Sequence, residues 1–107
     1  MTVTANFSSN ILSITGDNLD NTILASRDAA GTILVNGGAV AIADGPSTVA
    51  NTVLIQAVGQ SGDDTITLDE ANGALPSANL SGGDGNDTLT GGSGATISFS
   101  VRMVTTR

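Results

Sequence analysis

The most patterned part of this chain of 107 residues reads Leu80-Ser-Gly-Gly-Asp-Gly-Asn-Asp-Thr-Leu-Thr-Gly-Gly-Ser-Gly94. Within it, residues 82–90 fit every fixed position of the nonapeptide G-G-x-G-x-D-x-U-x, in which U is a large aliphatic residue. Glycine permits the positive φ angles of tight turns, whereas Thr88-Leu89-Thr90 alternates polar and apolar residues as a strand does. The segment therefore predicts a glycine-rich turn followed by a short strand.

Two imperfect copies flank the complete nonapeptide. Residues 91–99 follow it directly, but Thr96 replaces the aspartate of the sixth position and a serine takes the aliphatic position. Upstream, residues 59–67 keep Asp64 and the aliphatic residue, with Gln60 in place of the second glycine. The pattern therefore covers only part of the chain.

Short strand-forming runs recur along the chain, separated by breaks rich in glycine, asparagine or aspartate. The runs are Ile11–Thr15, Thr22–Ser26, Thr32–Val35, Val40–Ala43, Thr52–Ala57, Thr65–Leu68, Thr88–Thr90 and Ile97–Thr105. Six segments begin with a turn-forming or small residue, then threonine, then a large aliphatic residue, at Asn21, Gly31, Asn51, Asp64, Asp87 and Ala95. Neighbouring strand residues face opposite sides, so each aliphatic can enter a thin core while its threonine faces outward. Repeated units too small to bury their own apolar face are typical of a solenoid, and a β-sandwich is the competing fold.

Composition restricts the classes of function. The chain has ten acidic residues, three arginines and no lysine or histidine, which gives a net charge of −7. This balance disfavours nucleic acid and anionic membranes as partners and favours a cation. Because cysteine is absent as well, the usual nucleophile–base pairs cannot be assembled, and we expect no enzyme. No general secretory signal peptide is visible at the N-terminus, and the apolar runs are too short for membrane insertion.

The nonapeptides resemble the hemolysin-type calcium-binding repeats of the RTX family. The resemblance implies a parallel β-roll in which the first six residues form a loop and the last three a strand, with Ca²⁺ between loops of successive coils. Carried over position by position, it makes Asp64 and Asp87 the carboxylate ligands. It draws the carbonyl ligands from Gly59, Ser61, Gly62, Gly82, Gly83, Asp84 and Gly85. It also implies export by a type I route and a role outside the cell, with calcium ions as the partner.

We therefore predict a single all-β domain over residues 1–107, a right-handed parallel β-solenoid (β-helix or β-roll) of about five short coils. Residues 1–58 would form degenerate coils, and residues 59–99 the calcium-binding, β-roll-like repeats. The frames that start at Gly59 and Gly82 are 23 residues apart, so one coil can stack their loops into a Ca²⁺ site. Residues 91–99 would then lie over Leu68–Ser81, where no matching loop is present.

The predicted function is that of a calcium-binding structural module of a secreted RTX-like protein, in which Ca²⁺ bridges adjacent loops and stabilises the fold. One alternative is a self-assembling extracellular fibre or surface-layer subunit, a homo-oligomer stacked head to tail through the ends of the solenoid. Another is an accessory module of a larger secreted enzyme or adhesin. In a third, the glycines only make turns in a metal-free solenoid. Asp17 and Asp20, with Asn18 and Asn21, either bind another cation or form a polar turn.

Overall fold

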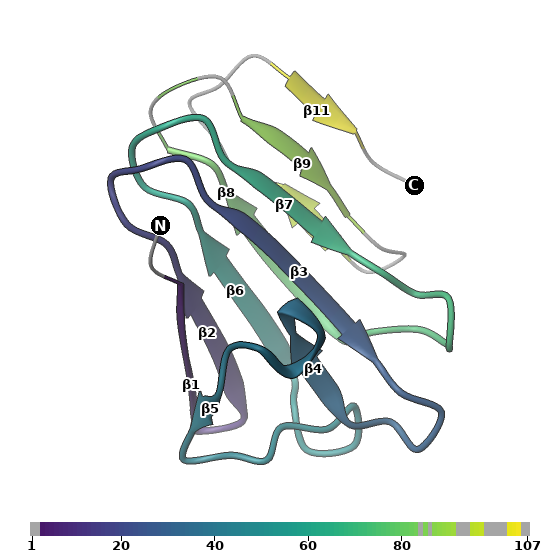
Figure 1. Cartoon of the computed structure of the whole chain (residues 1–107). Helices are drawn as coiled ribbons and strands as arrows, with labels where there is room; N and C mark the ends of the chain where they lie inside the picture. Colours follow the sequence, from purple (N-terminus) through teal and green to yellow (C-terminus); the bar gives the residue numbers. More distant parts are fainter. Residues whose placement is uncertain (1–2, 84, 86, 92–94, 98–102, 106–107) are drawn as a thin grey trace.

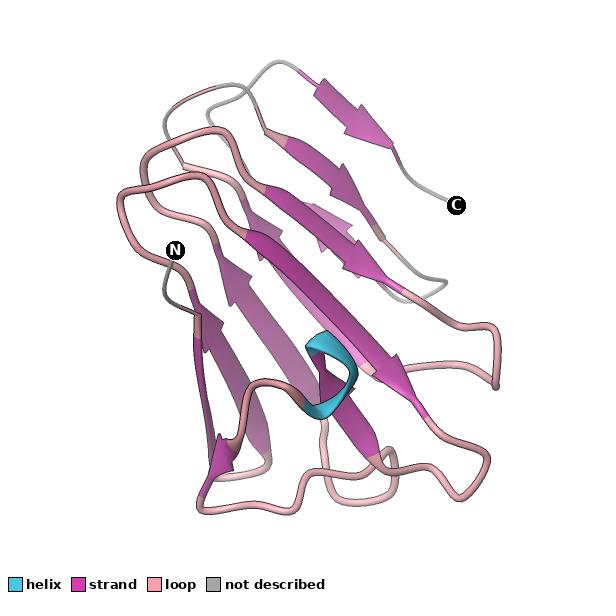
Figure 2. Cartoon of the chain, viewed as in Figure 1, coloured by secondary structure: helices cyan, strands magenta, loops and turns pink. Residues whose placement is uncertain are grey.

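The computed structural model describes residues 3–83, 85, 87–91, 95–97 and 103–105, which form two β-sheets facing one another (Figure 1). In chain order the elements are β1 (Thr4–Ser8), β2 (Ile11–Thr15), β3 (Thr22–Arg27), β4 (Ile33–Val35), η1 (Asn36–Gly38), β5 (Ile42–Ala43), β6 (Leu54–Val58), β7 (Thr65–Leu68), β8 (Ser77–Ser81), β9 (Thr88–Thr90), β10 (Ala95–Ile97) and β11 (Met103–Thr105). Apart from the short 3₁₀ turn η1, the elements are strands (Figure 2). No helix in this part of the chain is long and apolar enough to cross a membrane.

The strand orders within the described residues define two sheets. Sheet A has the order β10-β8-β6-β2-β1-β5, and sheet B has the order β11-β9-β7-β3-β4. From β6 onward the chain alternates between the sheets, so that β6, β8 and β10 enter sheet A and β7, β9 and β11 enter sheet B. The chain also crosses from sheet A to sheet B between β2 and β3. Strand β2 pairs parallel with β6, and strand β3 pairs parallel with β7.

Parallel register aligns the aliphatic side chains between the sheets. Ile23 pairs with Ile66, and Ile66 pairs with Leu89, and all three are fully buried. The buried apolar residues are Ala5, Leu12, Ile14, Ile23, Ala25, Ile33, Val35, Ile55, Ala57, Ile66, Leu68, Leu75, Ala78, Leu80 and Leu89. Burying one leucine or isoleucine side chain contributes about 1.5–3 kcal/mol, so this stack is the main stabilising element. The thin aliphatic core explains how a chain with two phenylalanines and no tryptophan or tyrosine can fold.

The predicted right-handed parallel β-solenoid of about five coils is wrong, because both sheets are mixed. Strand β1 is antiparallel to β2, and β4 is antiparallel to β3. Ser9 and Asn10 have φ angles of 52° and 67°, and this two-residue turn folds β1 back onto β2 as a hairpin. The second reversal follows Asp28, whose carboxylate accepts the N–H groups of Ala30 and Thr32 at 3.0 and 2.9 Å. Two tight turns therefore replace the first coils of the expected solenoid.

The pairing of residues 95–97 agrees with the predicted stacking of the C-terminal segments. Strand β10 lies parallel to β8 and pairs Ala95 with Ala78 and Ile97 with Leu80. This pairing confirms, for residues 95–97, that the segment following the complete nonapeptide lies over Leu68–Ser81. Residues 92–94 and 98–99 of that imperfect copy lie outside the described residues.

Three of the connections from sheet A to sheet B have the same length of six residues. Residues 16–21 (loop 1) join β2 to β3, residues 59–64 (loop 2) join β6 to β7, and residues 82–87 (loop 3) join β8 to β9. They lie side by side at the same end of the strands, at the upper left of Figure 1. We call these three segments the loop stack. The connection from β7 to β8, which returns from sheet B to sheet A, lies at the opposite end of the strands.

Candidate metal centre

Each loop of the loop stack begins with glycine and ends with asparagine or aspartate. The first positions are Gly16, Gly59 and Gly82, and the sixth positions are Asn21, Asp64 and Asp87. Strand register holds these positions in line, because Thr22 pairs with Thr65 and Thr65 pairs with Thr88. The loops are therefore stacked by the sheets that flank them.

The sixth-position side chains form a buried ladder. Asn21, Asp64 and Asp87 are 2 %, 1 % and 0 % exposed. The backbone N–H of Asn21 donates to Oδ1 of Asp64 at 2.8 Å, and the backbone N–H of Asp64 donates to Oδ1 of Asp87 at 2.7 Å. Each aspartate thus binds the sixth backbone amide of the preceding loop. Oδ1 of each carboxylate therefore has a hydrogen-bond donor.

The other oxygen of each carboxylate is buried without a donor. Oδ2 of Asp64 and Oδ2 of Asp87 have no hydrogen-bond partner among the described residues. Leaving a buried polar group unpaired costs about 1–3 kcal/mol, and more for a charged group. Two such oxygens on adjacent loops each require a hydrogen-bond donor or a cation.

The first-position glycines let these carboxylates lie where they do. A Cβ placed on Gly59 would collide with Oδ2 of Asp64, and one placed on Gly82 would come within 2.5 Å of Oδ2 of Asp87. The carboxylate of each loop therefore packs against the Cα of its own first residue. This contact explains why glycine at the first position and aspartate at the sixth occur together.

Burial raises the pKa of Asp64 above its ordinary value, and the nearby charge of Asp87 adds to this shift. Hydrogen bonds from Asn21 act in the opposite direction, because they favour the ionised carboxylate. The folded protein therefore resists ionisation of Asp64 unless a positive charge comes close. A divalent cation beside Asp64 and Asp87 would offset both the burial and the repulsion.

Backbone carbonyls also gather between successive loops. A Cβ on Gly83 would collide with the carbonyl oxygen of Gln60, and one on Gly85 with the carbonyl oxygen of Gly62. Gln60 and Gly83 share positive φ angles of 68° and 75° at the second position of their loops. Loops 2 and 3 thus have similar backbones and approach each other too closely for larger side chains.

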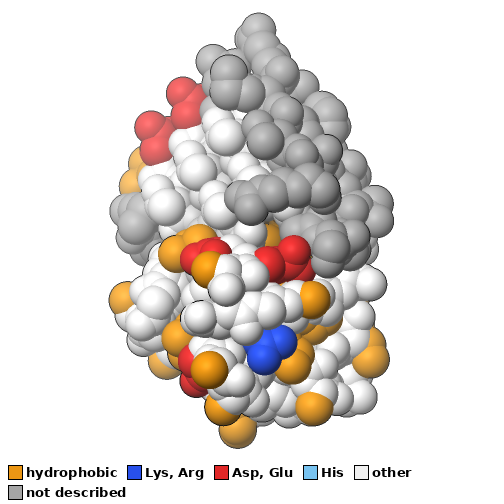
Figure 3. Space-filling view, turned by 90° about the vertical axis from the view of Figure 1, so that its right-hand side faces the viewer, with side chains coloured by type: hydrophobic (Ala, Val, Ile, Leu, Met, Phe, Trp, Pro, Cys, Tyr) orange, Lys and Arg blue, Asp and Glu red, His pale blue; other side chains and the backbone are white. Residues whose placement is uncertain are grey.

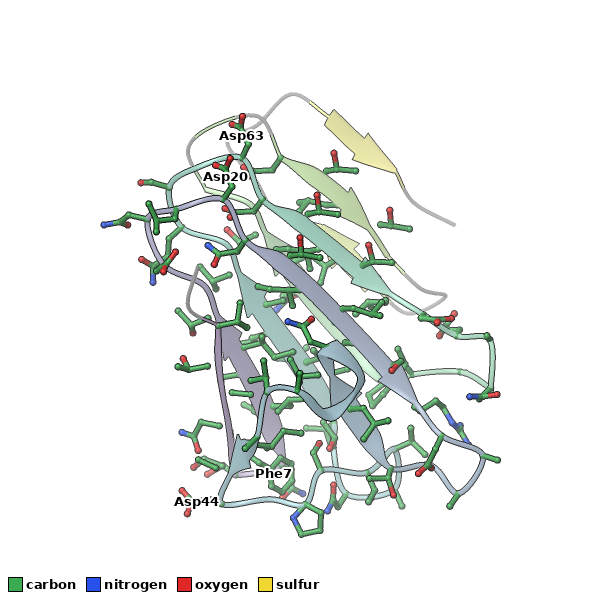
Figure 4. The ribbon with its side chains drawn as sticks, viewed as in Figure 1. Phe7, Asp20, Asp44 and Asp63 are labelled. Carbon is green, nitrogen blue, oxygen red and sulfur yellow. The ribbon has the colours of Figure 1, made fainter. Side chains whose placement is uncertain are left out.

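The acidic residues are concentrated in the segments of the sequence that make up the loop stack. Six of its ten acidic residues lie in the loop stack, and none of its arginines does. They are Asp17, Asp20, Asp63, Asp64, Asp84 and Asp87. Asp20 and Asp63 lie together at the tips of loops 1 and 2, where Oδ1 of Asp20 accepts the backbone N–H of Asp63 at 2.8 Å (Figure 4).

Arg27, the basic residue within the described part of the chain, does not neutralise the loop stack. Its Nη1 donates to the carbonyl oxygen of Ala74 at 3.1 Å, in the connection from β7 to β8. Figure 3 shows the side of the molecule that lies to the right in Figure 1, with Lys and Arg side chains in blue and Asp and Glu side chains in red. Among the described residues, Arg27 therefore leaves the charge of the loop stack without a basic side chain.

Most of the predicted metal ligands come together in loops 2 and 3. Gly59, Ser61, Gly62 and Asp64 belong to loop 2, and Gly82, Gly83, Gly85 and Asp87 belong to loop 3. Asp84 lies outside the described residues. Gly91, the first residue of the imperfect copy, follows β9 and therefore lies at the other end of the strands.

Loop 1 is the element that the nonapeptide pattern misses. Asp17 and Leu19 stand where the pattern requires glycine, and Asn21 stands where it requires aspartate. A usable signal was nevertheless present, because glycine precedes Asn21 by five residues and Thr22-Ile23 follows it. The same signature recurs in loops 2 and 3.

The donor set fits a hard, oxygen-binding cation. Carboxylate oxygens and backbone carbonyls are the ligands that Ca²⁺ takes in flexible geometry. Within the described residues, no three acidic, histidine or cysteine side chains come together, so backbone oxygens would supply most of the ligands. Buried unpaired oxygens and close-packed glycines at Asp64 and Asp87 agree with that requirement.

No family model, no curated protein and no solved structure matches the chain.

Proposed function

We propose that the chain is a calcium-binding structural module in which Ca²⁺ joins loop 2 to loop 3. Asp64 and Asp87 would supply the carboxylates, and carbonyl groups of the same two loops would complete the ligand set. The observation that carries the proposal is the pair of buried Oδ2 atoms on adjacent loops, neither of which has a donor among the described residues. When bound, the cation would supply the positive charge that these carboxylates lack.

Calcium suits these ligands better than other common divalent cations. The chain has no histidine or cysteine, which are the usual ligands for Zn²⁺. Mg²⁺ demands near-ideal octahedral geometry and retains several of its waters, whereas loops 2 and 3 offer fixed backbone oxygens. Ca²⁺ accepts irregular sets of about six to eight oxygens.

Metal binding at this position would be linked to folding. Asp64 and Asp87 come from loops that only the folded sheets bring together, so the unfolded chain has no equivalent site. Calcium would therefore stabilise the native state by mass action. The affinity expected for an extracellular module, a Kd of about 10⁻⁴–10⁻³ M, matches a secreted RTX-like protein in a calcium-rich medium.

The thermal unfolding of the whole chain in EDTA and in CaCl₂ tests the proposal. At about 10 mM Ca²⁺, this range of Kd corresponds to a stabilisation of about 1.4–2.7 kcal/mol for one site. We expect Tm to rise by several degrees with CaCl₂ and much less with equimolar MgCl₂. Equal Tm values in EDTA and CaCl₂ would overturn the proposal.

The alternative function, a fibre built by head-to-tail stacking, gains no specific support from the edge of the two sheets that β1, β4 and β5 form. There β1 pairs antiparallel with β2 and parallel with β5, and β4 pairs antiparallel with β3. The segment between β4 and β6 folds across this edge, where it lines an apolar pocket of about 260 Å³ with Ile33, Val40 and Ile42. We therefore keep the calcium-binding module as the proposed function.

A further inference from the structure

The three sixth-position side chains adopt the same pose but differ in one atom. In loops 2 and 3 the atom that lies against the first glycine is Oδ2 of Asp64 or Asp87. In loop 1 the atom in this place is Nδ2 of Asn21, which a Cβ on Gly16 would approach to 2.8 Å. An amide donor thus occupies in loop 1 the position that a bare carboxylate oxygen occupies in the other two loops.

The amide of Asn21 closes loop 1 from within. Its Nδ2 lies 2.6 Å from the carbonyl oxygen of Leu19 and 3.1 Å from both the carbonyl oxygen and Oδ1 of Asp17. It also lies 3.1 Å from Oδ1 of Asp64, so the same group joins loop 1 to loop 2. The oxygens that gather in loop 1 therefore have a donor that belongs to the protein.

Charge distinguishes Asn21 from its counterparts as clearly as hydrogen bonding does. Oδ1 of Asn21 is itself buried without a partner among the described residues, but it belongs to a neutral amide. A neutral polar group costs far less to bury than an ionised carboxylate. Loop 1 can therefore fold in the absence of a cation, whereas loops 2 and 3 bury two carboxylates in succession.

The backbone of loop 1 also departs from that of the other loops. At the fourth position Gly62 and Gly85 have φ angles of 98° and 105°, whereas Leu19 is not in the left-handed region. At the second position, Gln60 and Gly83 have positive φ angles, whereas Asp17 does not. Loop 1 turns the carbonyl groups of Asp17 and Leu19 toward its own amide, and so has a different arrangement from the two loops with aspartate.

We propose that the sixth residue decides which loops depend on calcium: the Asn21 amide replaces the metal in loop 1, and Ca²⁺ is confined to loops 2 and 3. This inference rests on the proposed function. It divides the loop stack into loop 1, which the Asn21 amide closes without metal, and loops 2 and 3, which calcium completes. Asn21 acts as a positioning residue, since it acts through Asp64.

Exchanges between asparagine and aspartate at the sixth position test the inference. Asp87→Asn and Asp64→Asn keep Oδ1 as an acceptor and replace the unpaired Oδ2 with an amide. We expect each variant to have a higher Tm than the wild type in EDTA and a smaller rise in Tm on addition of CaCl₂. Asn21→Asp adds a third buried carboxylate, so we expect a lower Tm in EDTA and a larger rise with CaCl₂.

Asp44→Asn is the matched control, because it removes one negative charge from an exposed residue at the opposite end of the molecule (Figure 4). Its φ angle of 62° is one that asparagine also adopts, so the exchange should not strain the backbone. We expect it to leave both the Tm in EDTA and the rise with CaCl₂ unchanged. A rise in Tm for Asp44→Asn equal to that of the loop variants would assign the effect to net charge and overturn the inference.

Unfolding by circular dichroism and calcium titration by calorimetry separate the two proposals. A wild type that neither binds calcium nor gains stability from it overturns the proposed function, and the inference with it. A wild type that responds to calcium, with an Asp87→Asn variant no more stable in EDTA and equally responsive, overturns the inference alone. An Asn21→Asp variant as stable in EDTA as the wild type does the same.

Discussion

Substituting Gly59 with alanine tests the contact on which the candidate centre depends. A Cβ at this position would overlap Oδ2 of Asp64 and lie 2.8 Å from its Cγ. Gly59 does not have a positive φ angle, so alanine fits its backbone and the penalty is steric. The carboxylate must move, and it must then give up the hydrogen bond from the backbone N–H of Asn21 at 2.8 Å.

The size of the effect follows from these two losses. A hydrogen bond to a charged group contributes about 1.5–3 kcal/mol, and overpacking a close-packed site costs about 1–3 kcal/mol. We therefore expect Gly59→Ala to lower the free energy of unfolding by about 3 kcal/mol or more, a large part of the total for a small domain. The chain has no tryptophan or tyrosine, so far-UV circular dichroism in urea is a suitable assay.

Gly37→Ala is the control for a glycine in open space. No atom lies within 4 Å of a Cβ there, but the φ angle is 66°, so only backbone strain of about 1–2 kcal/mol is expected. In CaCl₂, Gly59→Ala should lose more stability than in EDTA, because the displaced carboxylate is also a proposed ligand. A Gly59→Ala protein within about 1 kcal/mol of the wild type would refute the packing of Asp64 against Gly59.

Three further predictions concern the pH dependence, the core and the hairpin. The pKa of Asp64 is raised in the folded state, so the folded protein binds a proton there more tightly than the unfolded chain does. In EDTA, the resulting contribution of Asp64 to the free energy of unfolding is fully present below about pH 4 and is lost as the pH rises through the raised pKa. Urea unfolding in EDTA should therefore show a gain in stability from neutral pH toward mild acid, and Asp64→Asn should reduce that slope; a wild type that loses stability over this interval would contradict the sign of the shift. Ile66→Ala removes a fully buried side chain from the middle of the core, and we expect a loss of about 2–5 kcal/mol in the same assay, against less than about 0.5 kcal/mol for an exposed change such as Gln56→Ala. Asn10→Val places a β-branched residue at a φ angle of 67°, so it should cost about 1–2 kcal/mol, and an unchanged urea midpoint would argue against the β1–β2 turn.

Local pattern was sufficient to place several strands and both aspartates. The runs predicted at Ile11–Thr15, Thr65–Leu68 and Thr88–Thr90 coincide with β2, β7 and β9. Strand β8 was missed, because Ser77–Ser81 has a single large aliphatic residue, Leu80, among small and polar residues that have no strong preference for strands. Asp64 and Asp87 were recognised as equivalent because each ends a glycine-containing loop and precedes threonine and an aliphatic residue.

Strand direction was the main failure of the sequence-based prediction. Alternation of polar and apolar residues identifies a strand and its buried face, but parallel and antiparallel partners require the same alternation. The direction of β1 was decided by the turn at Ser9 and Asn10, which lacks the glycine that usually marks such hairpins. This turn makes sheet A mixed, and the reversal between β3 and β4 makes sheet B mixed, so two local turns replaced the predicted solenoid.

The sequence by itself determined the thin aliphatic core, the acidic loop stack and the spacing of glycine and aspartate in loops 2 and 3, because these are local properties of composition and period. The sequence placed Asn21, Asp64 and Asp87 among six similar segment starts, and only the tertiary structure decided that these three lie in one stack. The equivalence of Asn21 depends on the register of β3 with β7, which is set by the packing of Ile23 on Ile66 and not by the residues of loop 1. Tertiary structure also decided that one carboxylate oxygen of each aspartate is buried without a donor, since burial depends on the neighbouring loops.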